Sequence, residues 1–310
     1  MKRFLPIFIV ILLLAGASYF LLFNEEKQEI AAAPKQLVLE DFDKVRSCAI
    51  LPPFLYRNGI RRPLIDLSQQ HYKGVAFLYG PKFSKVLHKK TWERFDALGT
   101  YTIDRYGNIY LTPNPFISIN ASTFNLQKAI YKMDKESAKL ERWMEIDEIT
   151  PTASNPYGLI SVLYDCKDGT LWASAIDKSG YKGSRGRIYH INPKSKEVIE
   201  KIEGVDALTL AWLHTKKRRY LLIGSAIDNG LYAFRFENGK ILKSPRKLFE
   251  LPNPKLHIRK IKVAGKNRLY IEAIKFTYSL IAETTNQLRT HYMAVYDSDK
   301  KKWNIKELKQ

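Results

Sequence analysis

The feature that most constrains the fold is a unit of short strands and polar turns that recurs along most of the chain. One element of the unit is a turn carrying Gly or Asn, followed by a strand with an aromatic residue. Its copies lie at 105–112, 167–174, 218–224 and 266–272. A second β-rich element follows each copy, at 129–134, 187–192, 230–234 and 293–297. No long stretch after residue 36 has apolar residues at helical spacing, so the pattern predicts an all-β body.

Each unit also opens and closes with a β-rich run, which brings it to four strands. The opening runs are 100–103, 159–164, 208–213 and 258–263, and the closing runs are 140–146, 198–202, 247–251 and 303–308. Four strands that recur every 45–65 residues or so are typical of β-propeller blades, which bury their faces against neighbouring blades.

The blade count depends on the less regular first part of the body. The segments 48–56, 63–67, 74–79 and 91–95 can supply the four strands of a first blade. The body, residues 37–310, is then expected to hold five blades, or six if 37–42 belongs to another sheet. A pair of β-sandwiches is the alternative fold.

The clearest blade resembles the NHL-like and gluconolactonase-like (regucalcin-type) β-propellers. The stretches that carry the resemblance are 155–159, 167–174 and 186–193. In the metal-dependent lactonases of this type, Asn, Asp and Glu side chains of inner strands ligate a calcium-like ion at the central channel. A hard cation prefers oxygen ligands and can polarise a lactone carbonyl. The resemblance implies Asn155 and Asp228 as metal ligands in such an enzyme.

Loops from every blade of a propeller converge at the mouth of its channel, so a ligand site is expected there. The candidates are Asn114, Asn155, Asp177 and Asp228. Asp177 and Asp228 each end a Ser-Ala-Ile-Asp sequence in neighbouring units. Asp caps turns readily, so turn capping is the main interpretation of this pair, and ligand contact is the other.

The amino terminus predicts a membrane segment. Lys2 and Arg3 precede 4–23, twenty residues without a charge, and a polar linker follows at 24–36. At about 1.5 Å per residue, such a helix would span the roughly 30 Å core of a bilayer. The interpretation is a single-pass anchor of a bacterial inner membrane, with the body in the periplasm or otherwise extracytoplasmic. The alternative is a signal peptide over 1–23 and a body secreted after cleavage.

The chain carries 51 Lys+Arg against 31 Asp+Glu, a formal charge of +20. An exported basic body is better matched to anionic lipid, cell-wall polymer or an acidic protein than to nucleic acid, which is not expected as a partner. An ordinary solvated surface is the plainer interpretation. The clusters, including Arg259-Lys260 with Lys262, are expected in turns.

Two cysteines, Cys48 and Cys166, are assigned to blades that do not adjoin, so two buried free thiols are expected. None of the six histidines is spaced as a metal ligand pair, and no complete catalytic constellation is found. The leading hypothesis is therefore a membrane-anchored extracytoplasmic binding module without a cofactor. The alternative is a gluconolactonase-like hydrolase of a small lactone or ester that uses Ca²⁺ or another divalent cation.

Overall fold

The computed structural model describes residues 37–44, 46–95, 97–115, 121–180, 183–242, 244–279 and 289–308. Residues 37–310 form one compact unit. The predicted anchor and linker, residues 1–36, lie outside the described residues. Among the helices of the described ranges, none is long and apolar enough to cross a membrane.

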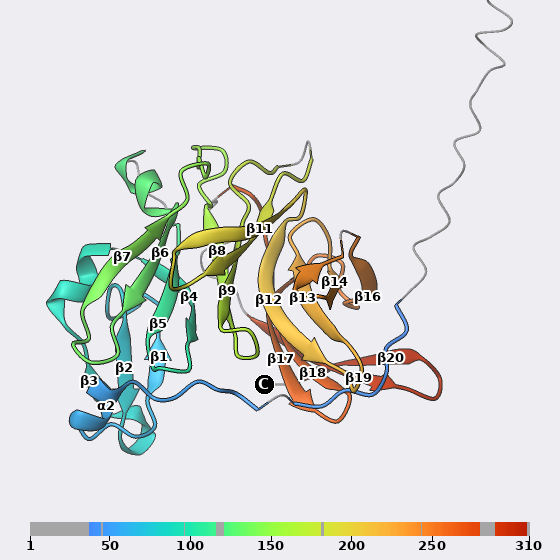
Figure 1. Ribbon diagram of the computed structural model, residues 1–310, viewed down its shortest axis with the longest axis horizontal. Coiled ribbons are helices and arrows are strands. Elements are labelled where there is room, and N and C mark those ends of the chain that lie inside the picture. Colours follow the sequence, from blue (N-terminus) through green and yellow to red (C-terminus); the bar gives the residue numbers. More distant parts are fainter. Residues whose placement is uncertain are drawn as a thin grey trace, which may run out of the picture. The chain divides into compact units, whose positions relative to one another are not determined.

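Five antiparallel sheets follow one another along the chain, in a five-blade β-propeller arrangement (Figure 1). Within each sheet the strands pair mostly in sequence order, so each sheet is a meander.

The first sheet comprises β1 (Leu64–Asp66), β2 (Ala76–Tyr79) and β3 (Lys85–Leu87). The second comprises β4 (Leu98–Ile103), β5 (Ile109–Pro113), β6 (Ala129–Met133) and β7 (Leu140–Glu145). The third comprises β8 (Leu159–Asp165), β9 (Thr170–Ala175), β10 (Arg187–Asn192) and β11 (Glu197–Glu203). The fourth comprises β12 (Ala207–His214), β13 (Arg219–Ser225), β14 (Gly230–Glu237), β15 (Lys240–Ile241) and β16 (Arg246–Glu250). The fifth comprises β17 (His257–Gly265), β18 (Arg268–Ile274), β19 (Thr290–Asp297) and β20 (Lys302–Leu308).

The predicted blades of 99–310 are thus confirmed, and the five sheets of the described residues exclude the pair of sandwiches. The first blade differs from its prediction. Residues 48–56 are not a strand, because 48–52 have no regular secondary structure and α2 (Pro53–Arg57) follows them. Residues 91–95 belong to the 3₁₀ helix η2 (Lys90–Phe95), where the Trp92 side chain is buried and its indole N–H donates to the Ala138 carbonyl at 2.9 Å. Two further 3₁₀ elements, η1 (Pro81–Phe83) and η3 (Ala121–Leu126), lie in loops.

Buried apolar clusters join each sheet to the next. Consecutive residues of a strand point to opposite faces, so an inner sheet can bury both. On β5, Ile109 and Leu111 pack toward the first sheet, whereas Tyr110 packs toward the third. On β13, Leu221 packs toward the third sheet and Leu222 toward the fifth. Of the described residues, no buried apolar cluster joins the fifth sheet to the first.

An extended segment at the start of the body, residues 37–44 and 46–51, crosses several blades, and we call it the N-terminal strap (blue in Figure 1). Leu37 N–H donates to the Lys247 carbonyl of the fourth sheet at 3.2 Å, and Phe42 forms an isolated bridge with Thr215. Phe42 N–H also donates to Asn267 Oδ1 at 2.7 Å, beside the fifth sheet. Residues 37–42 therefore start no sixth sheet in the described part of the chain.

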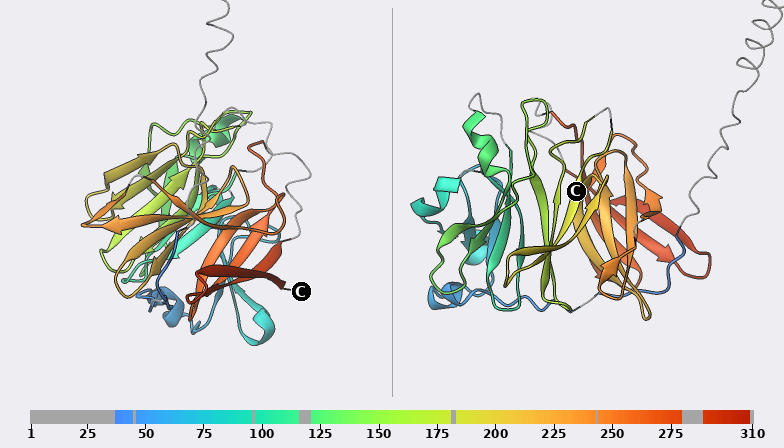
Figure 2. Two further views of the ribbon diagram at one scale, coloured as in Figure 1. Left: turned by 90° about the vertical axis from the view of Figure 1, so that its right-hand side faces the viewer. Right: turned by 45° about the horizontal axis from the view of Figure 1, so that its top comes forward.

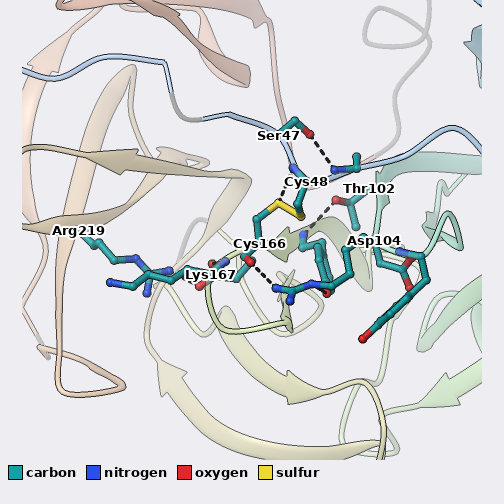
Figure 3. The surroundings of a disulfide bond; sticks show 12 residues. Ser47, Cys48, Thr102, Asp104, Cys166, Lys167 and Arg219 are labelled. Carbon is teal, nitrogen blue, oxygen red and sulfur yellow. Dashed lines mark hydrogen bonds and ion pairs between the residues drawn. A yellow bond between two sulfur atoms is a disulfide. The ribbon is translucent and has the colours of Figure 1, made fainter.

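The strap is held to the third blade by a disulfide between Cys48 and Cys166, whose Cα atoms lie 5.6 Å apart (Figure 3). The prediction of two free thiols is wrong. It assumed that both cysteines lie on the inner strands of blades that do not adjoin. Cys48 instead belongs to the strap, and Cys166 lies in the β8–β9 turn, where the strap passes. Arg105 of the second blade donates to the Cys166 carbonyl and links a further turn to this junction.

Candidate functional site: the central cavity

The innermost strands of all five blades, β1, β4, β8, β12 and β17, line a central cavity of about 850 Å³. The neighbours β4, β8, β12 and β17 also contact one another in this order around it. A volume of this size accommodates a small molecule, since ligand sites commonly measure about 300–1,000 Å³.

An apolar plug lies at the end of the cavity where β8 and β12 begin. Tyr278, from the segment that follows β18, packs there with Ile160 and Leu208. Its hydroxyl donates to the Asp206 carboxylate. Burial, together with this carboxylate, raises the pKa of Tyr278, so the phenol stays protonated.

The charged lining of the cavity is dominated by cations. It comprises Arg259, Lys260 and Lys262 of β17 together with Arg289, against the carboxylates Asp66 and Glu272. Glu272 is already compensated, because Lys260 Nζ lies 3.3 Å and Arg289 Nη1 lies 2.6 Å from its oxygens. The cavity wall is therefore an electropositive surface that attracts anions.

Arg259 differs from Lys260 and Arg289 of this lining because it forms no ion pair within the described residues. Its guanidinium donates to the carbonyls of Leu208 at 3.0 Å and Ile160 at 3.5 Å, on the two neighbouring inner strands. Arg259 is half-buried, and burial lowers its pKa. A planar guanidinium offers five N–H donors, more than these two contacts use, and it matches carboxylate or phosphate oxygens well.

Two hydroxyl-bearing residues line the same cavity as Arg259. Ser161 and Thr209 are both buried, and their hydroxyls have no hydrogen-bond partner in the described part of the chain. Because both residues line the cavity, their hydroxyls are available to hydrogen-bond an oxygen-rich ligand there. The described residues contain no group of three or more His, Cys, Asp and Glu side chains that could hold a metal ion.

Two of the four predicted site residues serve turns of the third blade. The Asn155 side-chain amide donates to the carbonyls of Ile176 at 2.6 Å and Ser179 at 2.8 Å. The Asp177 carboxylate accepts a hydrogen bond from Thr150 N–H at 2.9 Å and pairs with Arg187. Both side chains are buried and engaged by their own surroundings.

The other two residues differ in their surroundings. Asp228 accepts from Tyr232 Oη at 2.6 Å and Gly230 N–H at 3.0 Å, with Lys247 Nζ at 3.3 Å. Asn114 is the member of the four that lines the central cavity. Across the described ranges, no hydrogen bond or ion pair joins any two of the four, so the structure does not bring them together as one ligand set.

The environment of Asp228 predicts an acid-dependent contribution to stability. Burial alone would raise the pKa of this carboxyl, but the hydrogen bonds from Tyr232, Ser225 and Gly230, together with Lys247, hold it below its ordinary value of 3.8. A carboxyl with a lowered folded-state pKa stabilises the fold above pH 3.8 and loses that contribution as the pH falls through the folded value. We expect Asp228→Asn to lower the free energy of unfolding by about 1–2 kcal/mol at pH 7. Urea unfolding at several pH values should show this difference shrinking below pH 4, and a constant difference would contradict the assignment.

The cavity residues were missed at the sequence level because Arg259, Lys260 and Lys262 were expected in a turn. They lie within β17, an inner strand that borders the cavity. The run 258–263 is predicted as a strand, and the basic residues within it are the sequence signal that could have indicated a charged cavity wall.

The chain matches no known protein-family model. No curated protein is similar enough in sequence to count as a match. Solved structures with a related arrangement include the dihydro-heme d1 dehydrogenase NirN in complex with DHE. It is 10% identical, with a TM-score of 0.41 over 77% of this chain and 43% of that one. Another is the acylaminoacyl peptidase of Pyrococcus horikoshii, 10% identical, with a TM-score of 0.35 over 76% of this chain and 40% of that one. The chain thus spans less than half the length of each.

Proposed function

We propose that this chain is a binding module whose ligand is anionic and occupies the central cavity. The observation that carries the proposal is the set of donors in the cavity wall. Arg259 has no carboxylate partner in the described part of the chain, and Ser161 and Thr209 line the same cavity with hydroxyls that form no hydrogen bond to a described residue. This set resembles the donors that proteins use for carboxylate and phosphate groups.

We further propose that the module is membrane-anchored through residues 4–23 and extracytoplasmic, in the periplasm of a bacterium. The Cys48–Cys166 disulfide supports export, because disulfides form and persist in oxidising compartments. Its physiological ligand would then belong to the cell envelope, where anionic lipid, cell-wall polymer and acidic proteins are available. A relationship to the NHL-like propellers remains a prediction that rests on the blade motifs of the sequence.

Anion binding in the cavity is tested by titrating the full chain with citrate and with tripolyphosphate in a calorimeter. We expect at least one of these anions to bind, and Arg259→Gln to weaken it tenfold or more, as expected when a hydrogen bond to a charged group is lost. Lys262→Gln removes a cation of the same lining without touching the Arg259 contacts, and should weaken binding less. Lys217→Gln, in an exposed turn, is the matched control.

The outcome that overturns the proposal is equal binding by wild type and Arg259→Gln, or no binding of either anion. Calcium chloride serves as the cation probe in the same titration. A binding-module role without a resident cation predicts no heat of binding and no change in melting temperature with calcium.

A further inference from the structure

We propose that the open side of the ring, between the first and fifth sheets, is a docking groove for an extended segment of a partner protein in which acidic and aliphatic residues alternate. The inference concerns the side of the ring onto which the central cavity opens, where Lys262 and Tyr270 belong to both surfaces. It does not depend on the ligand of the central cavity.

The fifth sheet buries one face against the fourth sheet, and the described residues leave its other face uncovered, with Lys262, Arg268, Val295 and Lys306 exposed. Leu269 and Ile271 of β18 and Tyr292 of β19 pack against the fourth sheet. Side chains alternate along a strand, so their sequence neighbours Arg268 and Tyr270 lie on the opposite face. The fifth sheet, coloured orange to red, faces the viewer in the left view of Figure 2.

The uncovered face of the fifth sheet is basic. The strand register places Lys262, Tyr270, Met293 and Lys306 in one row across it, and Arg268 beside Val295 in another. Lys262, Arg268 and Lys306 are exposed and have no ion-pair partner in the described ranges. Two carboxylates of β18 and β19 lie on this face. Glu272 is already paired with Lys260 and Arg289, and Asp297 is paired with Lys300.

The corresponding face of the first sheet is aliphatic. Ile65, Phe77 and Leu87 form the row that packs toward the second sheet. The opposite row is Leu64, Leu78 and Val86, of which Leu64 is 48% and Val86 38% exposed. These neighbouring aliphatic side chains form an apolar surface that a partner can cover.

The two faces border the same space. Asp66 of the first sheet and Lys262 and Tyr270 of the fifth line one cavity, so the groove is continuous with the centre of the ring. An extended peptide between two walls presents odd side chains to one wall and even side chains to the other. One wall is basic and the other aliphatic, so the complementary segment alternates Glu or Asp with Val, Ile or Leu.

The experiment measures fluorescence anisotropy of a short labelled peptide in which Glu and Val alternate, titrated with the full chain. We expect saturable binding that weakens at least tenfold in Arg268→Glu/Lys306→Glu and in Leu64→Asp/Val86→Asp. All four side chains lie outside the central cavity lining. Lys194→Glu, in an exposed turn of the third blade, is the matched control and should bind normally. Arg259→Gln should also bind normally, which separates this site from the cavity.

Two peptide controls test the alternation itself. A peptide of the same composition with all Glu in one half and all Val in the other should bind at least tenfold more weakly, and one alternating Lys and Val should not bind. Equal affinity for the alternating and divided peptides would overturn the proposal. So would a lack of peptide binding accompanied by binding of phosphatidylglycerol vesicles that the same variants abolish, because the groove would then serve a lipid.

Discussion

Replacing Cys48 with Ser should lower the free energy of unfolding by about 4 kcal/mol, since a disulfide that closes a loop of some hundred residues restricts the unfolded chain by roughly this amount. Cys48 and Cys166 are 118 residues apart in sequence. The bond also fastens the N-terminal strap to the third blade, so its loss should free the strap around Cys48. Thermal unfolding of the full chain with and without dithiothreitol measures the effect.

Two controls distinguish the stabilising effect of the disulfide from that of the other contacts around Cys48. Wild type with reductant and Cys48→Ser/Cys166→Ser should unfold at similar temperatures, well below that of the oxidised wild type. Ser47→Ala changes the neighbouring side chain and keeps the bond, so its melting temperature should stay close to that of wild type. This role would be contradicted if dithiothreitol left the melting temperature of the wild-type protein unchanged.

Replacing Arg187 with Met should lower the free energy of unfolding by about 3–5 kcal/mol, because it leaves a buried carboxylate without its cation. The Asp177 side chain is 0% and the Arg187 side chain 5% exposed where they pair. Arg187 also lies 3.7 Å from the Glu148 carboxylate and donates to the Glu148 carbonyl at 3.4 Å. Urea unfolding measures the change.

Two variants make this test specific. Arg187→Met/Asp177→Asn removes the stranded charge while the amide oxygen can still accept from Thr150 N–H, so about half or more of the lost stability should return. Arg57→Met breaks an ion pair with Glu136 whose side chains are 55% and 52% exposed. Exposed pairs contribute little, and this change should cost less than about 1 kcal/mol. Equal losses in the Arg57 and Arg187 variants would refute the buried-charge argument.

The blades of the second to fifth sheets could be predicted because their signals are local. The strands around Ile109, Leu171 and Leu221 carry apolar residues on both faces, and a polar turn precedes each of them. The first blade was predicted poorly, since its strands are three or four residues long and its outer part is helical around Trp92. Strands of this length contain too few residues to show a recognisable alternation of apolar and polar side chains.

The candidate site could be predicted only as a region. The sequence favoured loops at the channel mouth, where Asn155 and Asp177 in fact serve their own blade. The residues that line the cavity, Arg259 and Thr209, look ordinary in sequence because their chemistry comes from neighbours on other strands. A missing carboxylate partner can be recognised only when every nearby strand is in place.

The sequence by itself determined the all-β body and the repeat of its blades, because strand periodicity and turn chemistry act over a few neighbouring residues. Only the tertiary structure decided that Cys48 meets Cys166, that basic β17 borders the cavity, and that no buried apolar cluster of the described residues joins the fifth sheet to the first. These features depend on the path of the strap and on how many sheets fill the ring. Both are set by packing between residues far apart in the chain.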